Sequence, residues 1–115
     1  MSENQDDLPL EIDVQGVKKL LDKGVDFFLL DCREPSEYAI AKLDSAVLIP
    51  MREIPARLPE LEPVRDQRIV VHCHHGGRSM QVTQWLQQQG FPRVQNMAGG
   101  IDAWSVEIDR AVARY

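Results

Sequence analysis

The chain has 115 residues, of which 43% are hydrophobic and 27% are charged. This length and this composition are typical of one globular domain with a core of its own. The formal net charge is −5, which argues against nucleic acid and anionic membrane as partners, because both attract basic surfaces. No apolar stretch approaches the roughly 20 residues that a membrane-spanning helix needs.

The N-terminal segment, Met1 to Asp7, is polar and acidic, and it lacks the positive start and apolar centre of a secretory signal. We expect a disordered tail over residues 1–7 and one domain over residues 8–115. Two cysteines, Cys32 and Cys73, are too few for a disulfide framework and favour a reducing compartment. We therefore expect a cytoplasmic protein, as a monomer or a weak dimer.

The first predicted helix begins after Asp13, a typical N-cap residue, and Gly24 suits the left-handed position beyond its end. Its predicted buried face holds four residues: Val14, Val17, Leu20 and Leu21. The continuous apolar run from Phe27 to Leu30 is typical of a strand that is covered on both faces.

A short helix through Tyr38 is predicted next, because Pro35 favours the first helical turn. Val47 to Ile49 then indicates another buried strand, which Pro50 stops. A further helix is expected where three apolar residues share one helical face: Ile54, Leu58 and Leu61.

Ile69 to Val71 predicts a third strand, and a helix from about Ser79 to Gln89 follows it after a loop. Val94 marks a short last strand. A C-terminal helix after Gly99-Gly100 is expected to bury four residues: Ile101, Trp104, Ile108 and Val112. We interpret Trp85 and Trp104 as core residues, since both fall on apolar helical faces.

Strands that alternate with helices predict an α/β fold, with a mainly parallel central sheet of about five strands and helices on both faces. Sites in such folds lie at the carboxyl ends of the strands. Two polar clusters follow two different strands, Asp31 to Arg33 and Cys73 to Arg78. We therefore expect both clusters at one rim of the sheet.

The second cluster has the composition of an anion-binding loop: Cys73, His74, His75, Gly76, Gly77, Arg78 and Ser79. A helix N-terminus carries about half a positive charge and unpaired N–H groups, so a thiolate beside it is stabilised. The pKa of such cysteines falls from about 8.5 to roughly 3.5–7.5. A buried core thiol needs neither two glycines nor an arginine after it, so we interpret Cys73 as a nucleophile.

Three stretches of the chain carry a family pattern. Leu30 to Tyr38 reads Asp-x-Arg-x-x-x-Glu-Tyr, Val71 to Ser79 holds Cys-x-x-Gly-x-Arg, and Met97 to Trp104 ends in Gly-Gly-x-x-Ala-Trp. In this order and spacing they resemble a single-domain rhodanese, a rhodanese-like sulfurtransferase, over about residues 10–115. The family commonly has Gly-His-Ile-x-Gly-Ala where this chain has Ala41 to Ala46, but Leu43 and Ala46 keep the apolar pattern, so we expect the same fold.

The resemblance implies that Cys73 takes a sulfane sulfur from a donor such as thiosulfate and becomes a persulfide. A thiophilic acceptor, either cyanide or a thiol of a small molecule or a protein, then removes the sulfur. The amides from His74 to Ser79 are expected to face the sulfur, and Gly76 and Gly77 to supply positive φ values. The resemblance implies no cofactor.

The roles of several residues stay open at this level. Arg78 either binds an oxyanion or braces the loop, and His74 and His75 either line the donor entrance or are solvated. Ion pairs that brace the rim are expected among three residues: Asp31, Arg33 and Glu37. Cys32 is interpreted as a small core residue, with a resolving thiol for Cys73 as the alternative.

A metal site is disfavoured, because adjacent side chains in His72 to His75 point in different directions and no distant cysteine pair completes a ligand set. The rival enzyme class is a cysteine-dependent phosphatase or arsenate reductase, whose loop resembles cysteine, five residues and arginine. Here four residues separate Cys73 from Arg78. A non-catalytic rhodanese-like binding module is the other alternative, although such modules tend to lose the cysteine.

Overall fold

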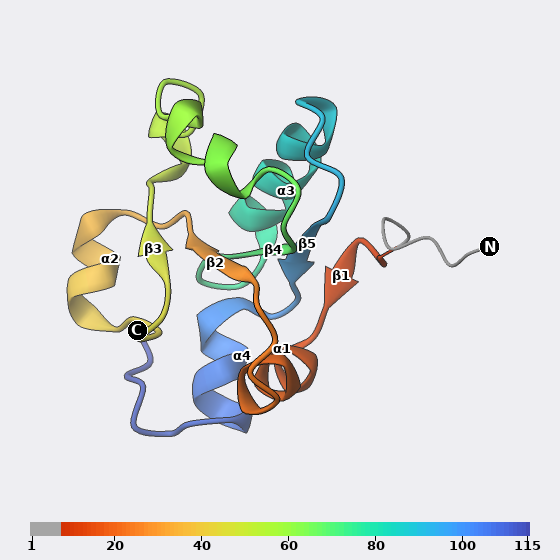
Figure 1. Cartoon of the computed structure of the whole chain (residues 1–115). Coiled ribbons are helices and arrows are strands. Elements are labelled where there is room, and N and C mark those ends of the chain that lie inside the picture. Colours follow the sequence, from red (N-terminus) through yellow and green to blue (C-terminus); the bar gives the residue numbers. More distant parts are fainter. Residues whose placement is uncertain (1–7) are drawn as a thin grey trace.

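Five parallel strands form the centre of the computed structural model, which describes residues 8–115 (Figure 1). The strand order is β1-β5-β4-β2-β3, with the bounds β1 Glu11–Ile12, β2 Phe28–Asp31, β3 Val47–Leu48, β4 Ile69–His72 and β5 Val94–Met97. The prediction of an α/β fold with a parallel sheet of about five strands is confirmed. The tail predicted for residues 1–7 lies outside the described residues.

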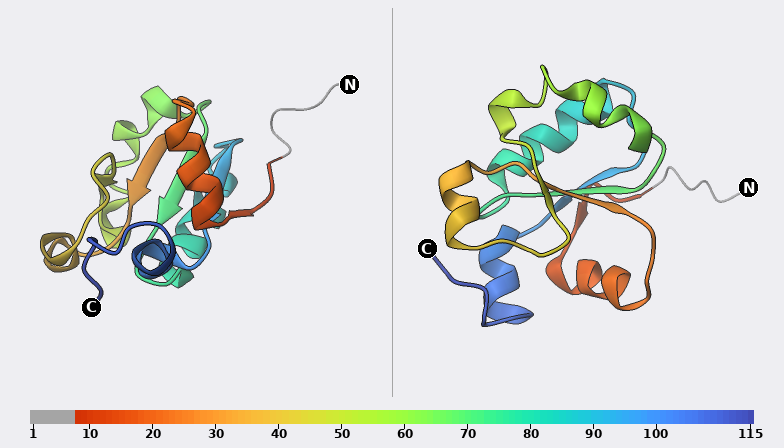
Figure 2. Two further views of the ribbon diagram at one scale, coloured as in Figure 1. Left: turned by 90° about the horizontal axis from the view of Figure 1, so that it is seen from below. Right: turned by 60° about the vertical axis from the view of Figure 1, so that its left-hand side comes forward.

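Helices cover both faces of this sheet (Figure 2). One face is covered by α3 (Gly77–Gln88) together with three short 3-10 helices, η1 (Met51–Glu53), η2 (Leu58–Glu60) and η3 (Glu62–Val64). The other face is covered by α1 (Val14–Asp22) and α4 (Gly100–Glu107). The remaining helix, α2 (Pro35–Ile40), lies at the β3 edge of the sheet (Figure 1).

Each face of the sheet has its own hydrophobic core. The core under α3 includes Leu30, Ile49, Leu61, Val71 and Leu86, and both cysteines belong to it. The core under α1 and α4 includes Val14, Leu29, Val70, Ile101 and Trp104. β2 and β4 lie between these cores, which is why Phe28 to Leu30 and Ile69 to Val71 are continuous apolar runs rather than alternating ones. β5 is equally buried but includes the polar residues Gln95 and Asn96.

The local signals at the helix ends are confirmed. The Asp13 side chain accepts a hydrogen bond of 2.8 Å from the Gly16 amide, as expected of an N-cap. Gly24 has a positive φ beyond the end of α1, and Pro35 is the first residue of α2. Leu21, however, is 38% exposed, so its predicted place on the buried face of α1 is wrong.

Proline spacing explains the main error in the predicted elements. The expected helix over Ile54, Leu58 and Leu61 is replaced by separate 3-10 turns. Pro59 lies inside that segment and has no N–H group to donate to the preceding turn, so an α-helix cannot continue through it. Ile54 and Leu61 are still fully buried, and Leu58 packs against them.

Three further differences concern the edges of the fold. Val47 is 44% exposed because β3 is an edge strand, and only the following Ile49 is fully buried. The strand β1, at the opposite edge, is too short to leave a pattern in the sequence. The predicted C-terminal helix ends at Glu107, although Ile108 and Val112 still pack against the core beneath it.

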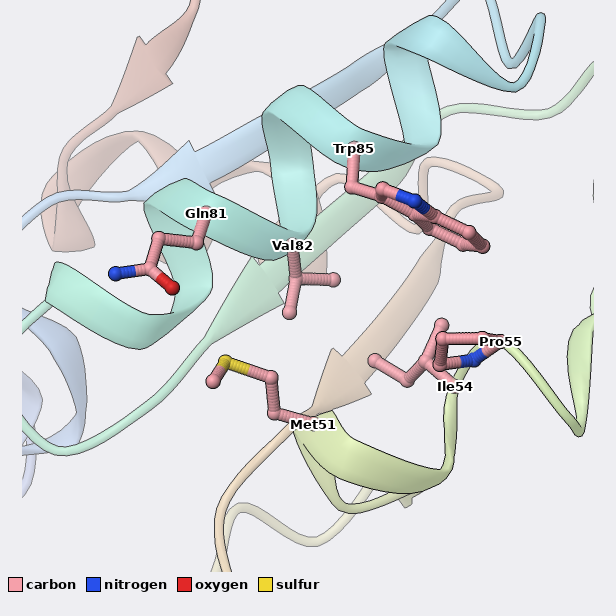
Figure 3. A pocket seen from close by; sticks show the side chains of 6 residues that line it. All are labelled: Met51, Ile54, Pro55, Gln81, Val82 and Trp85. Atoms are coloured by element: carbon pink, nitrogen blue, oxygen red, sulfur yellow. The ribbon is translucent and has the colours of Figure 1, made fainter.

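Trp85 is only partly buried, which corrects its interpretation as a core residue. It lines a surface pocket of about 250 Å³ between α3 and η1, together with Met51, Ile54, Pro55, Gln81 and Val82 (Figure 3). Trp104 is buried as expected.

The segment that departs from the family pattern keeps its packing. Ala41, Leu43 and Ala46 are all buried in the core under α1 and α4. The Ala46 amide donates to the Leu43 carbonyl at 3.0 Å, which closes a short turn. The expectation that the fold survives this departure is confirmed. No helix within residues 8–115 has the length and apolar character needed to span a membrane.

Candidate active site

Two neighbouring strands bring the polar clusters together. Asp31 at the end of β2 lies in register with His72 at the end of β4. Because parallel strands end at the same edge of a sheet, Asp31 to Arg33 and the loop after His72 share one rim, as predicted. The loop runs from Cys73 to Gly76 and leads directly into α3.

Hydrogen-bond donors surround the Cys73 sulfur. Its Sγ atom accepts from the Gly76 amide at 3.1 Å, from the Ser79 amide at 3.4 Å and from the Ser79 hydroxyl at 3.3 Å. The thiol is 1% exposed and belongs to the core under α3. A buried sulfur that meets donors from the first turn of a helix is a site for a sulfur anion.

Gly76 within the loop and Gly100 packed against it determine the shape of the loop. Gly76 has φ +113°, a conformation that favours glycine, whereas Gly77 begins α3 without a positive φ, so the expectation for Gly77 was wrong. Gly100 lies against the loop backbone, because a Cβ atom there would be 2.3 Å from the His74 carbonyl oxygen. The Ile101 amide donates to the Cys73 carbonyl at 2.9 Å, so the start of α4 holds the loop in place.

The balance of effects on the thiol favours the anion. Burial acts to raise the pKa of Cys73, but hydrogen bonds from Ser79 and from the Gly76 and His75 amides outweigh it and lower that pKa below its usual value. This is the direction that the sequence predicted. The Ser79 hydroxyl, whose part the sequence did not indicate, is the first of these donors, and Arg78 is not among the main causes.

Alkylation by iodoacetamide is expected to show this shift directly. The rate plotted against pH should have its midpoint below that of a free cysteine, near 8.5. Ser79→Ala should raise the midpoint by about half a unit to one unit, since it removes one donor from the thiolate. Ser45→Ala, at an exposed serine, is the matched control and should leave it in place. A wild-type midpoint at or above that of free cysteine contradicts the prediction.

Arg78 braces the loop rather than facing the sulfur. Its two terminal nitrogens bind the two carboxylate oxygens of Glu37 at 2.7 and 2.9 Å. Glu37 also accepts from the Glu34 amide and from the Tyr115 hydroxyl. Of the two roles left open for Arg78, the geometry supports the bracing one, because a guanidinium held in this way ties the first turn of α3 to α2.

Acid is expected to weaken this brace in a defined range. Hydrogen bonds from Arg78 lower the pKa of Glu37 to about 2, from a usual value of 4.5. The stability that the pair contributes is therefore complete above pH 4.5 and is lost as the pH falls toward 2. Urea unfolding of wild type and Glu37→Gln should differ at pH 6 and converge near pH 2. A difference that is the same at both pH values would count against the pair.

Asp31 and Arg33 form the expected ion pair, and both side chains are fully buried. The Arg33 Nε and Nη2 atoms lie 2.9 and 2.7 Å from the two Asp31 carboxylate oxygens. Arg33 also donates to the Ala41 carbonyl and to the Tyr115 hydroxyl. Glu37 is not part of this ion pair, since its carboxylate binds Arg78 instead and Arg33 reaches only its carbonyl.

The histidines have separate environments. The His74 ring stacks between His75 and Tyr115, with ring centroids 3.9 Å apart in both cases. Burial lowers the pKa of His74, and the neighbouring His75 lowers it further. His72 is fully buried, and burial lowers its pKa to about 4, so its ring is neutral at pH 7. Within residues 8–115, no group of three or more histidine, cysteine or acidic side chains is arranged to hold a metal ion.

Cys32 has the environment of a core thiol. It is fully buried, and its Sγ atom donates to the His72 carbonyl at 3.5 Å. Burial raises the pKa of Cys32, and the nearby Cys73 and Asp31 raise it further. A thiol that is hard to ionise is a poor attacking group, which supports the structural interpretation over the resolving one.

Cys32→Val is therefore expected to leave the chemistry at Cys73 unchanged. The alkylation midpoint of Cys73 and the rate of sulfur transfer should both stay within about twofold of wild type, since valine fills a similar apolar volume. Peptide mapping of peroxide-treated wild type is the second measurement. A disulfide between Cys32 and Cys73 as the main product would establish the resolving role instead.

Two residues that contact this site, Tyr115 and Asn96, were not predicted. Tyr115 reaches Arg33 across 82 residues of sequence and stacks on His74. Asn96 on β5 is buried and contacts Ser79 and Gly76. The only sequence signal for Asn96 was a polar residue near the end of a buried strand. No local signal marked Tyr115.

Comparisons of the sequence with known proteins support the resemblance to rhodanese-like proteins. The family model for the rhodanese-like domain matches residues 13–107. A sulfurtransferase of Allochromatium vinosum is 40% identical over 95 residues, which cover 83% of this chain and 87% of that protein. A chloroplastic rhodanese-like/PpiC domain-containing protein of Arabidopsis thaliana is 42% identical over 91 residues, but these span 76% of this chain and only 30% of the relative.

Solved structures of rhodanese-like proteins and sulfurtransferases have the same fold as this chain. A rhodanese-like domain protein from Staphylococcus aureus has a TM-score of 0.79 at 26% identity, and the match covers 93% of this chain and 99% of that one. The human single domain sulfurtransferase TSTD1 has a TM-score of 0.76 at 25% identity, over 87% of this chain and 98% of that one. On the family match, the curated relatives and the shared fold together, this chain belongs to the rhodanese-like domain family.

Proposed function

We propose that the protein is a sulfurtransferase that moves one sulfane sulfur from a donor such as thiosulfate to a thiophilic acceptor through a persulfide on Cys73. The observation that supports this most is the set of donors around the Cys73 sulfur, which favours an anion at that atom. Relatives named as sulfurtransferases, at 36–40% identity, give independent support.

The first half of the cycle loads the sulfur. The Cys73 thiolate attacks the outer sulfur of thiosulfate, a new S–S bond forms, and the original S–S bond of thiosulfate breaks. Sulfite leaves with the electron pair, and the enzyme keeps a persulfide whose outer sulfur carries the negative charge. The loop amides that surround the Cys73 sulfur lie close to that charge and compensate for it.

The second half unloads it. The acceptor, cyanide or a thiolate, attacks the outer sulfur of the persulfide and forms thiocyanate or a new persulfide. The bond to the Cys73 sulfur breaks, and the thiolate is restored. A low pKa makes Cys73 a good leaving group in this step, so the same hydrogen bonds serve both halves.

The dimensions and charges of the loop argue against phosphate chemistry. Only four residues separate Cys73 from Arg78, which makes a small ring. The Arg78 guanidinium binds Glu37 through both terminal nitrogens, so it is not directed at three phosphate oxygens. These features disfavour the phosphatase or arsenate reductase alternative.

The remaining site residues have supporting roles in this proposal. Gly76 and Ser79 supply donors to the sulfur, and Gly77 joins the loop to α3. His74 and His75 line the approach to the loop, with His75 exposed to solvent. The acceptor is a small thiol or a protein thiol. Two free cysteines suit a reducing compartment, so we place the reaction in the cytoplasm.

Intact-mass analysis after incubation with thiosulfate tests the proposal. Wild type should gain the mass of one sulfur atom, and cyanide should remove it with the formation of thiocyanate. Cys73→Ser should gain nothing, while Cys32→Val should behave like wild type. Hydrolysis of an aryl phosphate without any sulfur gain from thiosulfate or from an organic persulfide would overturn the proposal.

A further inference from the structure

Asn96 connects the Cys73 loop to the edge of the sheet. The residue lies on β5, is 1% exposed, and its side chain makes three hydrogen bonds. Its Oδ1 atom accepts from the Ser79 hydroxyl at 2.5 Å, and its Nδ2 atom donates to the Gly76 carbonyl at 3.3 Å and to the Glu11 carboxylate at 2.9 Å. Glu11 lies opposite Asn96 in the register of β1 and β5.

These contacts permit one orientation of the Asn96 amide. The Gly76 carbonyl and the Glu11 carboxylate are acceptors only, so they must face the NH2 group. The amide oxygen is left facing Ser79, and it can only accept. The opposite orientation would place two oxygens against the amide oxygen and is excluded by repulsion.

The Ser79 hydroxyl therefore has one proton and two acceptors. One acceptor is Asn96 Oδ1 at 2.5 Å, and the other is Cys73 Sγ at 3.3 Å. A neutral sulfur is a weak acceptor, so the proton points to Asn96 when Cys73 is a thiol or carries a neutral inner sulfur. A thiolate is a charged acceptor and attracts the proton to itself.

We propose that Asn96 is a positioning residue for sulfur transfer. Its amide oxygen accepts the hydrogen bond of the Ser79 hydroxyl whenever the Cys73 sulfur is uncharged, and the hydroxyl donates to the sulfur instead when that sulfur becomes an anion. This inference rests on the proposed function of Cys73 as the sulfur carrier. The hydroxyl stays in place throughout the cycle, because it always has an acceptor. When the persulfide breaks, a donor is already beside the sulfur that takes the electron pair.

The competition between Asn96 and the Cys73 thiolate for the Ser79 hydrogen bond predicts the direction in which the alkylation midpoint of Cys73 changes. Donating to the thiolate breaks the bond between Ser79 and Asn96, so Asn96 reduces the net benefit of that donation. In Asn96→Leu the Ser79 proton has no competing acceptor. The midpoint of Cys73 alkylation by iodoacetamide should then fall by about half a unit to one unit.

A double-mutant cycle separates this role from a purely structural one. In a Ser79→Ala background, Asn96→Leu should leave the midpoint unchanged, because the effect of Asn96 passes through the Ser79 proton. Gln95→Leu is the matched control. It removes an equally buried amide from the same strand, one that contacts Arg68 and Pro9 instead, and it should not move the midpoint.

Asn96→Leu also removes the amide donor to the Glu11 carboxylate, and any effect of Glu11 on Cys73 that does not pass through Ser79 would persist in the Ser79→Ala background. The other charged and titratable neighbours of Cys73 are retained in every variant. Cys32 is held as a thiol by burial, Arg78 stays paired with Glu37, and His74 and His75 are retained. Circular dichroism reports folding. If Asn96→Leu does not fold, Asn96→Ala removes the same acceptor with a smaller apolar group, and the same shift is expected.

Loading with thiosulfate, measured on the same samples, separates the two proposals. If wild type gains no sulfur from thiosulfate or from an organic persulfide, the proposed function fails, whatever the midpoints are. If wild type gains sulfur but Asn96→Leu and Asn96→Ala raise the midpoint or leave it unchanged, the positioning role alone is overturned. A fall that persists in the Ser79→Ala background also overturns it.

Discussion

Cys73→Ser is expected to abolish sulfur transfer while leaving the protein folded. A serine hydroxyl at this position still accepts from the Gly76 and Ser79 amides, so the loop keeps its hydrogen bonds. Its oxygen is not ionised near pH 7 and does not form a stable bond to a sulfane sulfur. The rate of thiocyanate formation from thiosulfate and cyanide should fall by at least about a thousandfold.

The second cysteine provides the control for this experiment. Cys32→Val removes the other buried thiol of the same core and should retain transfer. Both variants should show the circular dichroism spectrum of wild type. Sulfur transfer by Cys73→Ser at the wild-type rate would show that Cys73 is not the sulfur carrier and that the hydrogen bonds to its sulfur do not serve catalysis.

Local signals were sufficient for most of the fold. The cap at Asp13, the proline at the start of α2 and the apolar runs of β2 and β4 each depend on neighbours in the sequence. For that reason they can be interpreted without tertiary information. The main error was a local signal that was missed, since Pro59 breaks the helix predicted over Ile54, Leu58 and Leu61. Other errors occur where the outcome depends on distant segments. The exposure of Val47 follows from the edge position of β3. That position could not be predicted, because the sequence of a single strand does not determine which strands lie beside it.

The candidate site divides in the same way. The position of Cys73 between a strand and a helix is a local pattern, so its low pKa was predicted correctly in direction. The partner of Arg78 was not predictable, because Glu37 is 41 residues away and reaches it only when α2 and α3 meet. Asn96 depends on three separate elements, β1, β5 and α3, for its contacts.

The largest effect on stability is expected at the rim beneath the site. Arg33→Met should lower the free energy of unfolding by about 3–5 kcal/mol, because it leaves the Asp31 carboxylate buried without a counter-ion. It also removes the donor to the Ala41 carbonyl. Urea unfolding at pH 7 measures the change. Lys18→Met, which breaks the exposed pair with Asp22, is the matched control and should cost less than about 1 kcal/mol.

A double variant decides whether the charge is the cause. Asp31→Leu combined with Arg33→Met removes both charges, so no uncompensated carboxylate remains, and its cost should be smaller than that of Arg33→Met alone. A double variant that costs as much as the sum of the two single changes would show that packing, not charge pairing, holds the rim.

Arg33 also contacts Tyr115, which contacts Glu37, the partner of Arg78. Because this chain of contacts runs from the buried pair to the first turn of α3, a rim weakened at Arg33 should also raise the alkylation midpoint of Cys73.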